Sequence, residues 1–208
     1  MIYLLSSSFH DGVENLPMIE FVPTANSIDF SSYDILLFTS QNAVSIINEI
    51  NPAWLDFPCI AIGSQTAKKI KELGGLVIGV SESYYASSLS QMIREKFANK
   101  RILYIRPKEI ASNALLSLKD HDIDIDDRII YETKCKNYDI SHKPPKGAVI
   151  IATSPSTIKC FVKNFRSFDG YKVVAIGDTT AAALPAGTDF VIASKPVIAE
   201  CIKLAKEI

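Results

Sequence analysis

The sequence predicts an α/β fold in which helices cover both faces of parallel sheets. Three observations carry this prediction. Short apolar runs alternate with helical patterns of about ten residues, which is typical of parallel sheets. A strand, turn and helix start occur twice, as AIGSQTAKKIKEL and AIGDTTAAAL. Each copy follows a Thr-Ser turn at one distance, because 24 positions separate Thr39 from Gly63 and likewise Thr153 from Gly177.

The two repeats predict the same order of strands and helices. Each opens with an apolar strand that ends in Thr-Ser, within DILLFTS in the first repeat and AVIIATS in the second, and a helical pattern follows. The A-I-G strand and its helix come next. A short β-branched run, a serine and an amphipathic helix close each repeat. In the last helix, Pro196 fits the first helical position with Ser194 near the cap. The order is therefore β-α-β-α-β-α.

Two further segments bear on the domain organisation. KRILYIRPKEIASNALLSL predicts a strand, a turn and a helix, and the opening MIYLLSSSFHDGVENL predicts them more loosely. If the opening strand joins the sheet of the second repeat, the first repeat lies in an inserted domain between two antiparallel linking strands. The expected α/β domains are 1–18 with 138–208, and 31–121; the linking strands are 19–30 and 122–137. The alternative is a tandem pair cut near Asn137, with the opening strand in the first repeat.

Composition excludes several classes of partner. The 208 residues are 48% hydrophobic, enough for real cores, and 22 Lys and Arg against 23 Asp and Glu give a net charge of -1. No basic field would attract nucleic acid or an anionic membrane. The opening residues lack the basic region of a signal peptide, and no apolar run approaches a membrane span. We expect a cytoplasmic protein.

The cysteines and histidines suggest no metal centre. Four cysteines stand apart, without a Cys-x-x-Cys pair or a neighbouring histidine, so we expect buried free thiols and no disulfide framework. These are Cys59, Cys135, Cys160 and Cys201, and the isolated histidines are His10, His121 and His142. The acidic stretch from Asp122 to Asp127 alternates with isoleucine, which favours a solvated strand face over a metal site.

Four strand-end turns are candidate anion sites, because loops at the carboxyl ends of parallel strands line the ligand crevice. They are Thr39-Ser40, Gly63-Ser64, Thr153-Ser154 and Gly177-Asp178. Each precedes a helix, whose first N–H groups lack intrahelical partners and favour negative charge. Taken singly, Ser40, Ser154 and Asp178 fit ordinary N-caps. If the two domains face each other, the four turns would suit a flexible ligand with several carboxylates.

The motifs LLFTSQNAV, the two A-I-G-x-x-T-A turns, LYIRP, IIYETK and IIATSPSTI stand in this order. Together they resemble the bacterial uroporphyrinogen-III synthases over nearly the whole chain. The resemblance implies two flavodoxin-like domains joined by a two-stranded linker, with the first strand in the domain that the C-terminal segment completes. It implies a lyase that cyclises hydroxymethylbilane to uroporphyrinogen III with inversion of ring D and loss of water. It also implies no metal and no cofactor, and we expect a monomer.

The resemblance assigns roles to residues. Tyr131 in IIYETK matches the tyrosine that assists loss of the hydroxyl, and a phenol with an ordinary pKa near 10 stays protonated at neutral pH. Without the resemblance, Tyr131 would be taken as a packing residue of a linking strand. The turns and the resemblance together give these substrate-binding candidates: Thr39, Ser40, Asn42, Gly63, Ser64, Thr66, Arg106, Ser154, Ser156, Gly177 and Thr180.

The sequence departs from the family in places. Pro107 stands where many members have glycine, and Asn113-Ala114-Leu115 stands where an arginine would precede a leucine. Arg106 is kept, whereas the later arginine that could form an ionic clamp is missing. Asp178 puts a carboxylate at one anion site; we expect it to cap its helix and leave Thr180 for the ligand. Two other functions stay open.

The first rival function is a two-lobed sensor for an anionic small molecule, which should carry a helix-turn-helix or a signal peptide. The second is a nucleotide-sugar or dinucleotide enzyme, which needs a glycine-rich first turn, whereas LLSSSFHDG offers one late glycine. G-x-x-x-x-G-K-[ST] loops are also absent from the sequence.

Overall fold

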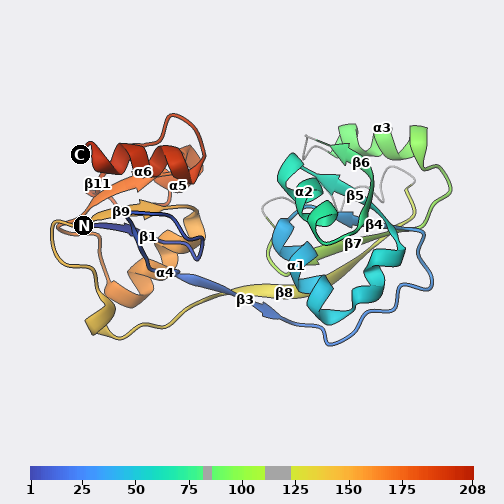
Figure 1. Cartoon of the computed structure of the whole chain (residues 1–208), viewed down its shortest axis with the longest axis horizontal. Helices are drawn as coiled ribbons and strands as arrows, with labels where there is room; N and C mark the ends of the chain where they lie inside the picture. Colours follow the sequence, from blue (N-terminus) through green and yellow to red (C-terminus); the bar gives the residue numbers. More distant parts are fainter. Residues whose placement is uncertain (82–85, 111–122) are drawn as a thin grey trace. The chain divides into compact units, whose positions relative to one another are not determined.

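The computed structural model describes residues 1–81, 86–110 and 123–208 (Figure 1). The chain forms two compact units: unit 1 is Met1–Glu20 with Lys134–Ile208, and unit 2 is Phe21–Thr133. Parallel strands alternate with helices in both units, which confirms the predicted α/β class. In the described part of the chain, no helix is long and apolar enough to cross a membrane.

Unit 1 is built on a five-stranded sheet in the order β11-β10-β9-β1-β2. Its strands are β1 (Ile2–Leu4), β2 (Glu14–Asn15), β9 (Val149–Ala152), β10 (Lys172–Ala175) and β11 (Asp189–Ile192), with α4 (Pro155–Phe165), α5 (Asp178–Ala181), α6 (Ile198–Lys206) and the 3-10 turn η3 (Ile140–His142). Successive strand residues point to opposite faces, so Ile150 packs with Phe161 of α4 while Ile151 packs with Cys201 of α6. Helices therefore cover both faces.

The opening strand lies beside the second repeat. β1 pairs in parallel with β9, with Ile2 opposite Val149 and Leu4 opposite Ile151. The first strand of the chain therefore lies in the same sheet as its last three strands.

Unit 2 carries a six-stranded sheet in the order β3-β8-β7-β4-β5-β6. Its strands are β3 (Ile19–Pro23), β4 (Ile35–Phe38), β5 (Pro58–Ile62), β6 (Leu76–Ser81), β7 (Ile102–Pro107) and β8 (Ile125–Cys135), with α1 (Gln41–Ile50), η1 (Pro52–Asp56), α2 (Ser64–Glu72) and α3 (Ala86–Lys96). On one face Phe38 packs with Ile47 of α1, and on the other Leu37 packs with Ile93 of α3. The predicted helix after β7 and His121 fall largely or wholly outside the described residues.

The linking strands β3 and β8 are antiparallel. Thr24 N–H donates to Ile130 O at 2.8 Å, and Lys136 N–H donates to Met18 O at 2.9 Å. β8 also pairs in parallel with β7, so it is a full sheet strand as well as a linker. Salt bridges join Asp126 to Arg101 and Asp127 to Arg106, so these acidic residues lie against basic ones.

The expectation of four free thiols is wrong for two of them. Cys135, at the end of β8, forms a disulfide with Cys160 of α4, with the Cα atoms 5.2 Å apart. The two lie 25 residues apart, a separation that carries no sequence signal, and packing of α4 on the sheet brings them together. Cys59 and Cys201 are free and buried, and burial raises their pKa values to about 12 and about 11.

Two predicted helix starts are also wrong. α6 begins at Ile198 with Val197 as its N-cap, so Pro196 lies outside the helix. Asp178 is the first residue of α5, whose N-cap is Gly177 without a side-chain cap. α5 has only four residues, and Pro185 shortly after it prevents continuation because proline has no N–H to donate.

Gly75 provides a packing test in unit 2. A Cβ on Gly75 would lie 2.6 Å from Cζ3 of the buried Trp54 and 2.8 Å from Cγ2 of Ile70. We expect Gly75→Ala to lower the free energy of unfolding by about 1–3 kcal/mol through overpacking, measured by urea denaturation. Gly79→Ala is the control, since its Cβ would meet nothing closer than 3.4 Å. Equal stability of the two variants would contradict the packing described here.

Candidate active site

The turn after β4 places two hydroxyl groups at the carboxyl end of the unit 2 sheet. Ser40 is the N-cap of α1, and its Oγ accepts a hydrogen bond from Asn42 N–H at 3.1 Å. Serine suits this position because its side chain satisfies an N–H that has no intrahelical partner. Thr39, Ser40 and Asn42 are all partly exposed. The structure therefore brings these three predicted binding residues together.

Two buried tyrosines reach this turn from opposite faces of the sheet. The Tyr131 hydroxyl donates to Ser40 Oγ at 3.4 Å, and the Tyr104 hydroxyl shares a hydrogen bond with Thr39 Oγ1 at 3.2 Å. Tyr131 packs with Phe38 on the α1 face, whereas Tyr104 packs with the residues of the α3 face. Because adjacent residues at a strand end point to opposite faces, each tyrosine meets one hydroxyl of the Thr-Ser pair.

Burial raises the pKa values of both phenols. Tyr131 is 3% exposed and Tyr104 is 2% exposed. Desolvation raises the pKa of Tyr131 above 10, and the hydrogen bond with Ser40 partly offsets this by lowering it. Desolvation also raises the pKa of Tyr104, against the lowering effects of the Thr39 hydrogen bond and the Arg106 charge. Both phenols therefore keep their protons at neutral pH.

Arg106 is already paired. Its Nε donates to Asp127 Oδ2 at 2.7 Å and one terminal NH2 group donates to Pro107 O at 2.9 Å. A ligand carboxylate would have to compete with Asp127 for this guanidinium. Pro107 also coincides with a register shift, since Arg106 lies opposite Ile129 but Pro107 lies opposite Tyr131. Proline cannot donate a ladder hydrogen bond, and an irregularity of this kind redirects a side chain.

The two A-I-G turns expose fewer of the predicted binding residues than the sequence suggested. Gly63, the N-cap of α2, has φ 82°, in the left-handed region that favours glycine, and its N–H donates to Ser81 O at 2.8 Å. Ser64 is exposed, but Thr66 is only 4% exposed. In the second turn Gly177 is in extended conformation, and Thr180 is likewise buried.

In unit 1, Ser154 of the Thr-Ser turn forms its hydrogen bonds within the first turn of α4. Thr157 N–H donates to Ser154 Oγ at 3.3 Å, and Ser154 N–H donates to Thr157 Oγ1 at 3.2 Å, which forms a capping box. Ser156 is exposed in the first turn of α4. The expectation that Asp178 caps its helix is wrong, as described above, and the Thr180 side chain faces the interior.

Tyr104 and Asp127 were not identified from the sequence. Both lie in segments that strand alternation assigns only to packing or to a solvated face. The signal that could have found Tyr104 is its position on the strand next to β4, with its side chain on the face that Thr39 also uses. Asp127 is opposite Tyr104 in the ladder, which brings it beside Arg106.

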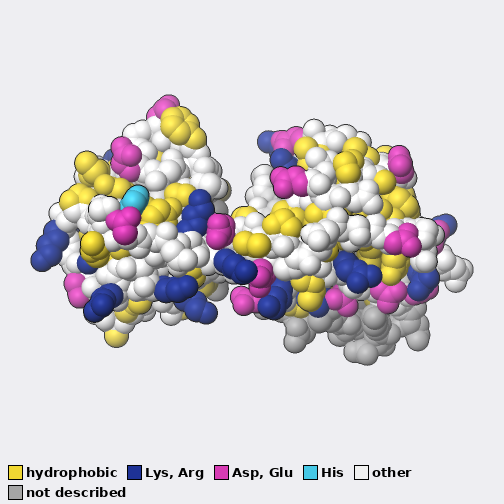
Figure 2. All heavy atoms as spheres, turned by 90° about the horizontal axis from the view of Figure 1, so that it is seen from below, with side chains coloured by type: hydrophobic (Ala, Val, Ile, Leu, Met, Phe, Trp, Pro, Cys, Tyr) yellow, Lys and Arg dark blue, Asp and Glu magenta, His cyan; other side chains and the backbone are white. Residues whose placement is uncertain are grey.

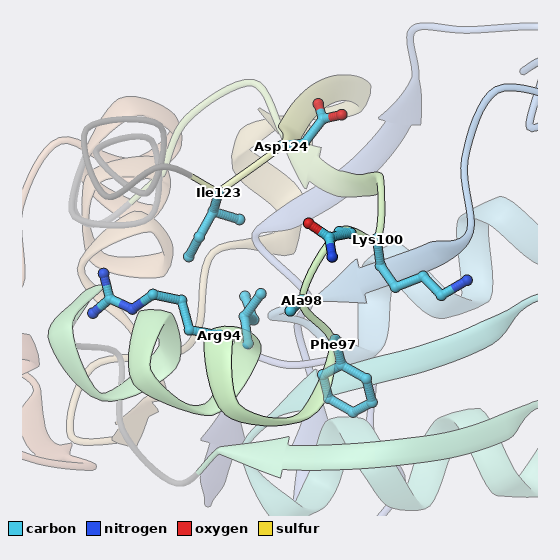
Figure 3. A pocket seen from close by; sticks show the side chains of 8 residues that line it. Arg94, Phe97, Ala98, Lys100, Ile123 and Asp124 are labelled. Carbon is cyan, nitrogen blue, oxygen red and sulfur yellow. The ribbon is translucent and has the colours of Figure 1, made fainter.

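A separate hollow lies at the amino end of β7, away from this turn. Its lining comes from the end of α3 and from the segment before β8, including Phe97, Lys100, Ile123 and Asp124 (Figure 3). None of the predicted site residues lines it. Among the residues that the structure describes, no cluster of His, Cys, Asp or Glu could hold a metal ion.

Comparison with known proteins identifies the family. A family model described as uroporphyrinogen-III synthase HemD matches residues 12–203. The porphyrin biosynthesis protein HemD of Ruminiclostridium josui is 29% identical over 216 residues, covering 92% of this chain and 43% of the relative. The chain thus spans less than half the length of that curated relative.

Solved structures give the same result. The crystal structure of uroporphyrinogen-III synthetase from Helicobacter pylori 26695 matches with a TM-score of 0.82 and 28% identity, covering 99% of this chain and 98% of that one. A mutant uroporphyrinogen III synthase from the extremely thermophilic bacterium Thermus thermophilus shares the fold, with a TM-score of 0.51, 14% identity and coverages of 94% and 90%. Because the family match extends over nearly all of its length, the chain belongs to the uroporphyrinogen-III synthase family.

Proposed function

We propose that this chain is a uroporphyrinogen-III synthase, a lyase that cyclises hydroxymethylbilane to uroporphyrinogen III with inversion of ring D and loss of water. The observation that carries the proposal is the buried Tyr131 hydroxyl, which donates to Ser40 at the carboxyl end of the sheet. Family membership supplies the reaction class.

The reaction requires two things of the protein. It must supply a proton to the departing hydroxyl, and its binding site must fix the conformation of the substrate. When the hydroxymethyl group loses its oxygen as water, the electrons of the pyrrole nitrogen stabilise the resulting azafulvene. Tyr131 supplies the proton that lets water leave, and general acid catalysis of this kind contributes about 10²- to 10⁴-fold. The remaining task is to control which carbon is attacked, which is a matter of positioning.

Hydrogen-bond donors, more than cationic side chains, hold the carboxylates of the substrate. α1 presents N–H groups at its first turn. In α4, Pro155 has no N–H and the Thr157 N–H is bonded to Ser154, so Ser156 supplies the backbone donor there. Thr39, Asn42, Ser64 and Ser156 also have exposed or partly exposed polar side chains near helix starts. On the face shown in Figure 2, Lys and Arg lie among Asp and Glu on both units, so neither charge dominates there. A polycarboxylate bound this way needs no large positive field.

We further propose that the two units are flavodoxin-like domains joined by β3 and β8, and that residues of both bind the substrate. The order of strands and helices in each unit and the antiparallel hydrogen bonds of the linking strands support the first point. We also propose a monomer that acts in the cytoplasm.

The test mixes the protein with enzymatically generated hydroxymethylbilane and separates the macrocycle isomers by chromatography. Hydroxymethylbilane closes unaided without inversion, so a reaction without protein is the matched control. We expect the type III isomer to predominate when the protein is present. Formation of the unrearranged type I isomer alone, with correctly folded protein, would contradict the proposed function.

A further inference from the structure

The buried position of Tyr131 raises the question of how its proton reaches a substrate. Its ring packs against Phe38 and Ile130 in the core, and the ring of Phe21 lies edge-on to it with the centroids 5.5 Å apart. Only 3% of the residue is exposed. Its hydroxyl donates to Ser40 Oγ, and Ser40 is partly exposed. The accessible end of this hydrogen bond is therefore the serine.

The hydrogen bonds of Ser40 fix what its hydroxyl can do. A hydroxyl oxygen has two lone pairs and one proton. Ser40 Oγ accepts from Asn42 N–H at 3.1 Å and from the Tyr131 hydroxyl at 3.4 Å, which occupies both lone pairs. Its own proton is the part that remains for a ligand. Ser40 is thus oriented as a donor with a second proton source directly behind it.

We propose that Ser40 is a catalytic residue that gives its proton to the departing hydroxyl of hydroxymethylbilane while Tyr131 replaces that proton. The inference rests on the proposed function and deepens it, because it makes Tyr131 act through Ser40. The C–O bond of the hydroxymethyl group breaks with its electron pair on oxygen, and the Ser40 proton converts that oxygen to water. The Tyr131 proton moves to Ser40 Oγ, leaving a phenolate beside the cationic azafulvene.

The proton balance closes within one turnover. For ring D to invert, the azafulvene first bonds to the substituted carbon of that ring, giving a spiro intermediate. The bond from this carbon to its original bridge carbon then breaks, which forms a second azafulvene. The free α-carbon of ring D bonds to that bridge carbon and loses a proton as the pyrrole regains aromaticity. That proton returns through Ser40 to the phenolate, which restores both hydroxyls. The net change is the loss of one water, and no external acid, oxidant or reductant is consumed.

A proton relay and a helix cap require different chemical groups in the side chain at position 40. A cap needs only an acceptor, so asparagine caps a helix about as well as serine, whereas a relay needs a hydroxyl. We expect Ser40→Asn to fold with a thermal midpoint near that of the wild type but to lose about 10²-fold or more in kcat, with KM changed only a few-fold. Ser40→Thr retains a hydroxyl and should keep most of kcat.

The control for losing a buried phenol hydroxyl is Tyr171→Phe. The Tyr171 hydroxyl donates to Pro144 O at 2.6 Å in unit 1 and takes no part in the site. We expect kcat of this variant to equal that of the wild type. A double variant of Ser40→Asn and Tyr131→Phe should be no slower than the slower single variant, because both changes break one relay.

These outcomes separate the relay from the proposed function. If the wild type makes no type III isomer, the proposed function fails. If it does and Ser40→Asn matches it, or if the two losses multiply in the double variant, the relay is overturned. A proton inventory on the wild type, measured in single turnovers, needs no variant. Two protons in flight predict a curved dependence of rate on deuterium fraction, and a linear dependence would also overturn the relay.

Discussion

Tyr131→Phe is expected to lower kcat by about 10²-fold or more while KM stays close to the wild-type value. The variant keeps the ring that packs against Phe38 and Phe21, so the core and the edge-on contact remain. It removes only the hydroxyl that donates to Ser40. The rate of hydroxymethylbilane consumption and the fraction of type III isomer are the quantities to measure.

The pH dependence of kcat is a second test of the role of the Tyr131 phenol. Desolvation raises the pKa of the Tyr131 phenol above its usual value of 10, so the proton is present throughout the neutral range. We therefore expect no fall in wild-type kcat between about pH 7 and pH 9 from this group, with a loss only above about pH 10. Wild-type turnover in Tyr131→Phe, or loss of activity centred near pH 7 through this residue, would remove Tyr131 from the mechanism.

Reduction of the Cys135–Cys160 disulfide is expected to have the largest effect on stability. The bond closes a loop of 25 residues, and the chain-entropy relation gives roughly 3–4 kcal/mol for a loop of this length. We expect an excess of dithiol to lower the free energy of unfolding of the protein by about that amount, as measured by urea denaturation.

The reduced protein should nevertheless keep its fold. Asn164 holds the same segment to α4, since its Nδ2 donates to Lys136 O at 2.8 Å and its Oδ1 accepts from Tyr138 N–H at 2.8 Å. The control is a double variant with serine at positions 135 and 160, whose stability should not respond to dithiol. Identical unfolding midpoints of the wild type with and without dithiol would show that the bond does not form. A reducing compartment would hold the pair as thiols.

The regular parts of the fold were predictable because they depend on short-range pattern. Apolar runs such as Ile35–Phe38 and Val149–Ala152 are buried on both faces, which is typical of central parallel strands. The serine and threonine after them predicted helix starts, and α1 and α4 begin there. The N-cap of α5 and the start of α6 were missed because several weak capping signals compete in those segments.

The site was only partly predictable because its geometry depends on pairing across strands. Thr66 was predicted to bind the substrate, yet it lies on the same helical stripe as Ile70, and both are buried against the sheet. The hydrogen bond between Thr39 and Tyr104 joins residues 65 positions apart, and the one between Ser40 and Tyr131 joins residues 91 apart. No local pattern specifies either, since strand order and register create them.

The most direct test of the proposed substrate site is to map where uroporphyrinogen III, the product, contacts isotopically labelled protein by amide NMR under anaerobic conditions. We expect the largest chemical-shift changes at the strand-end turns, at Ser40 and Asn42 after β4 and at Ser156 after β9. Changes concentrated instead at the hollow around Phe97 and Lys100, with the strand-end turns unchanged, would contradict the proposed site.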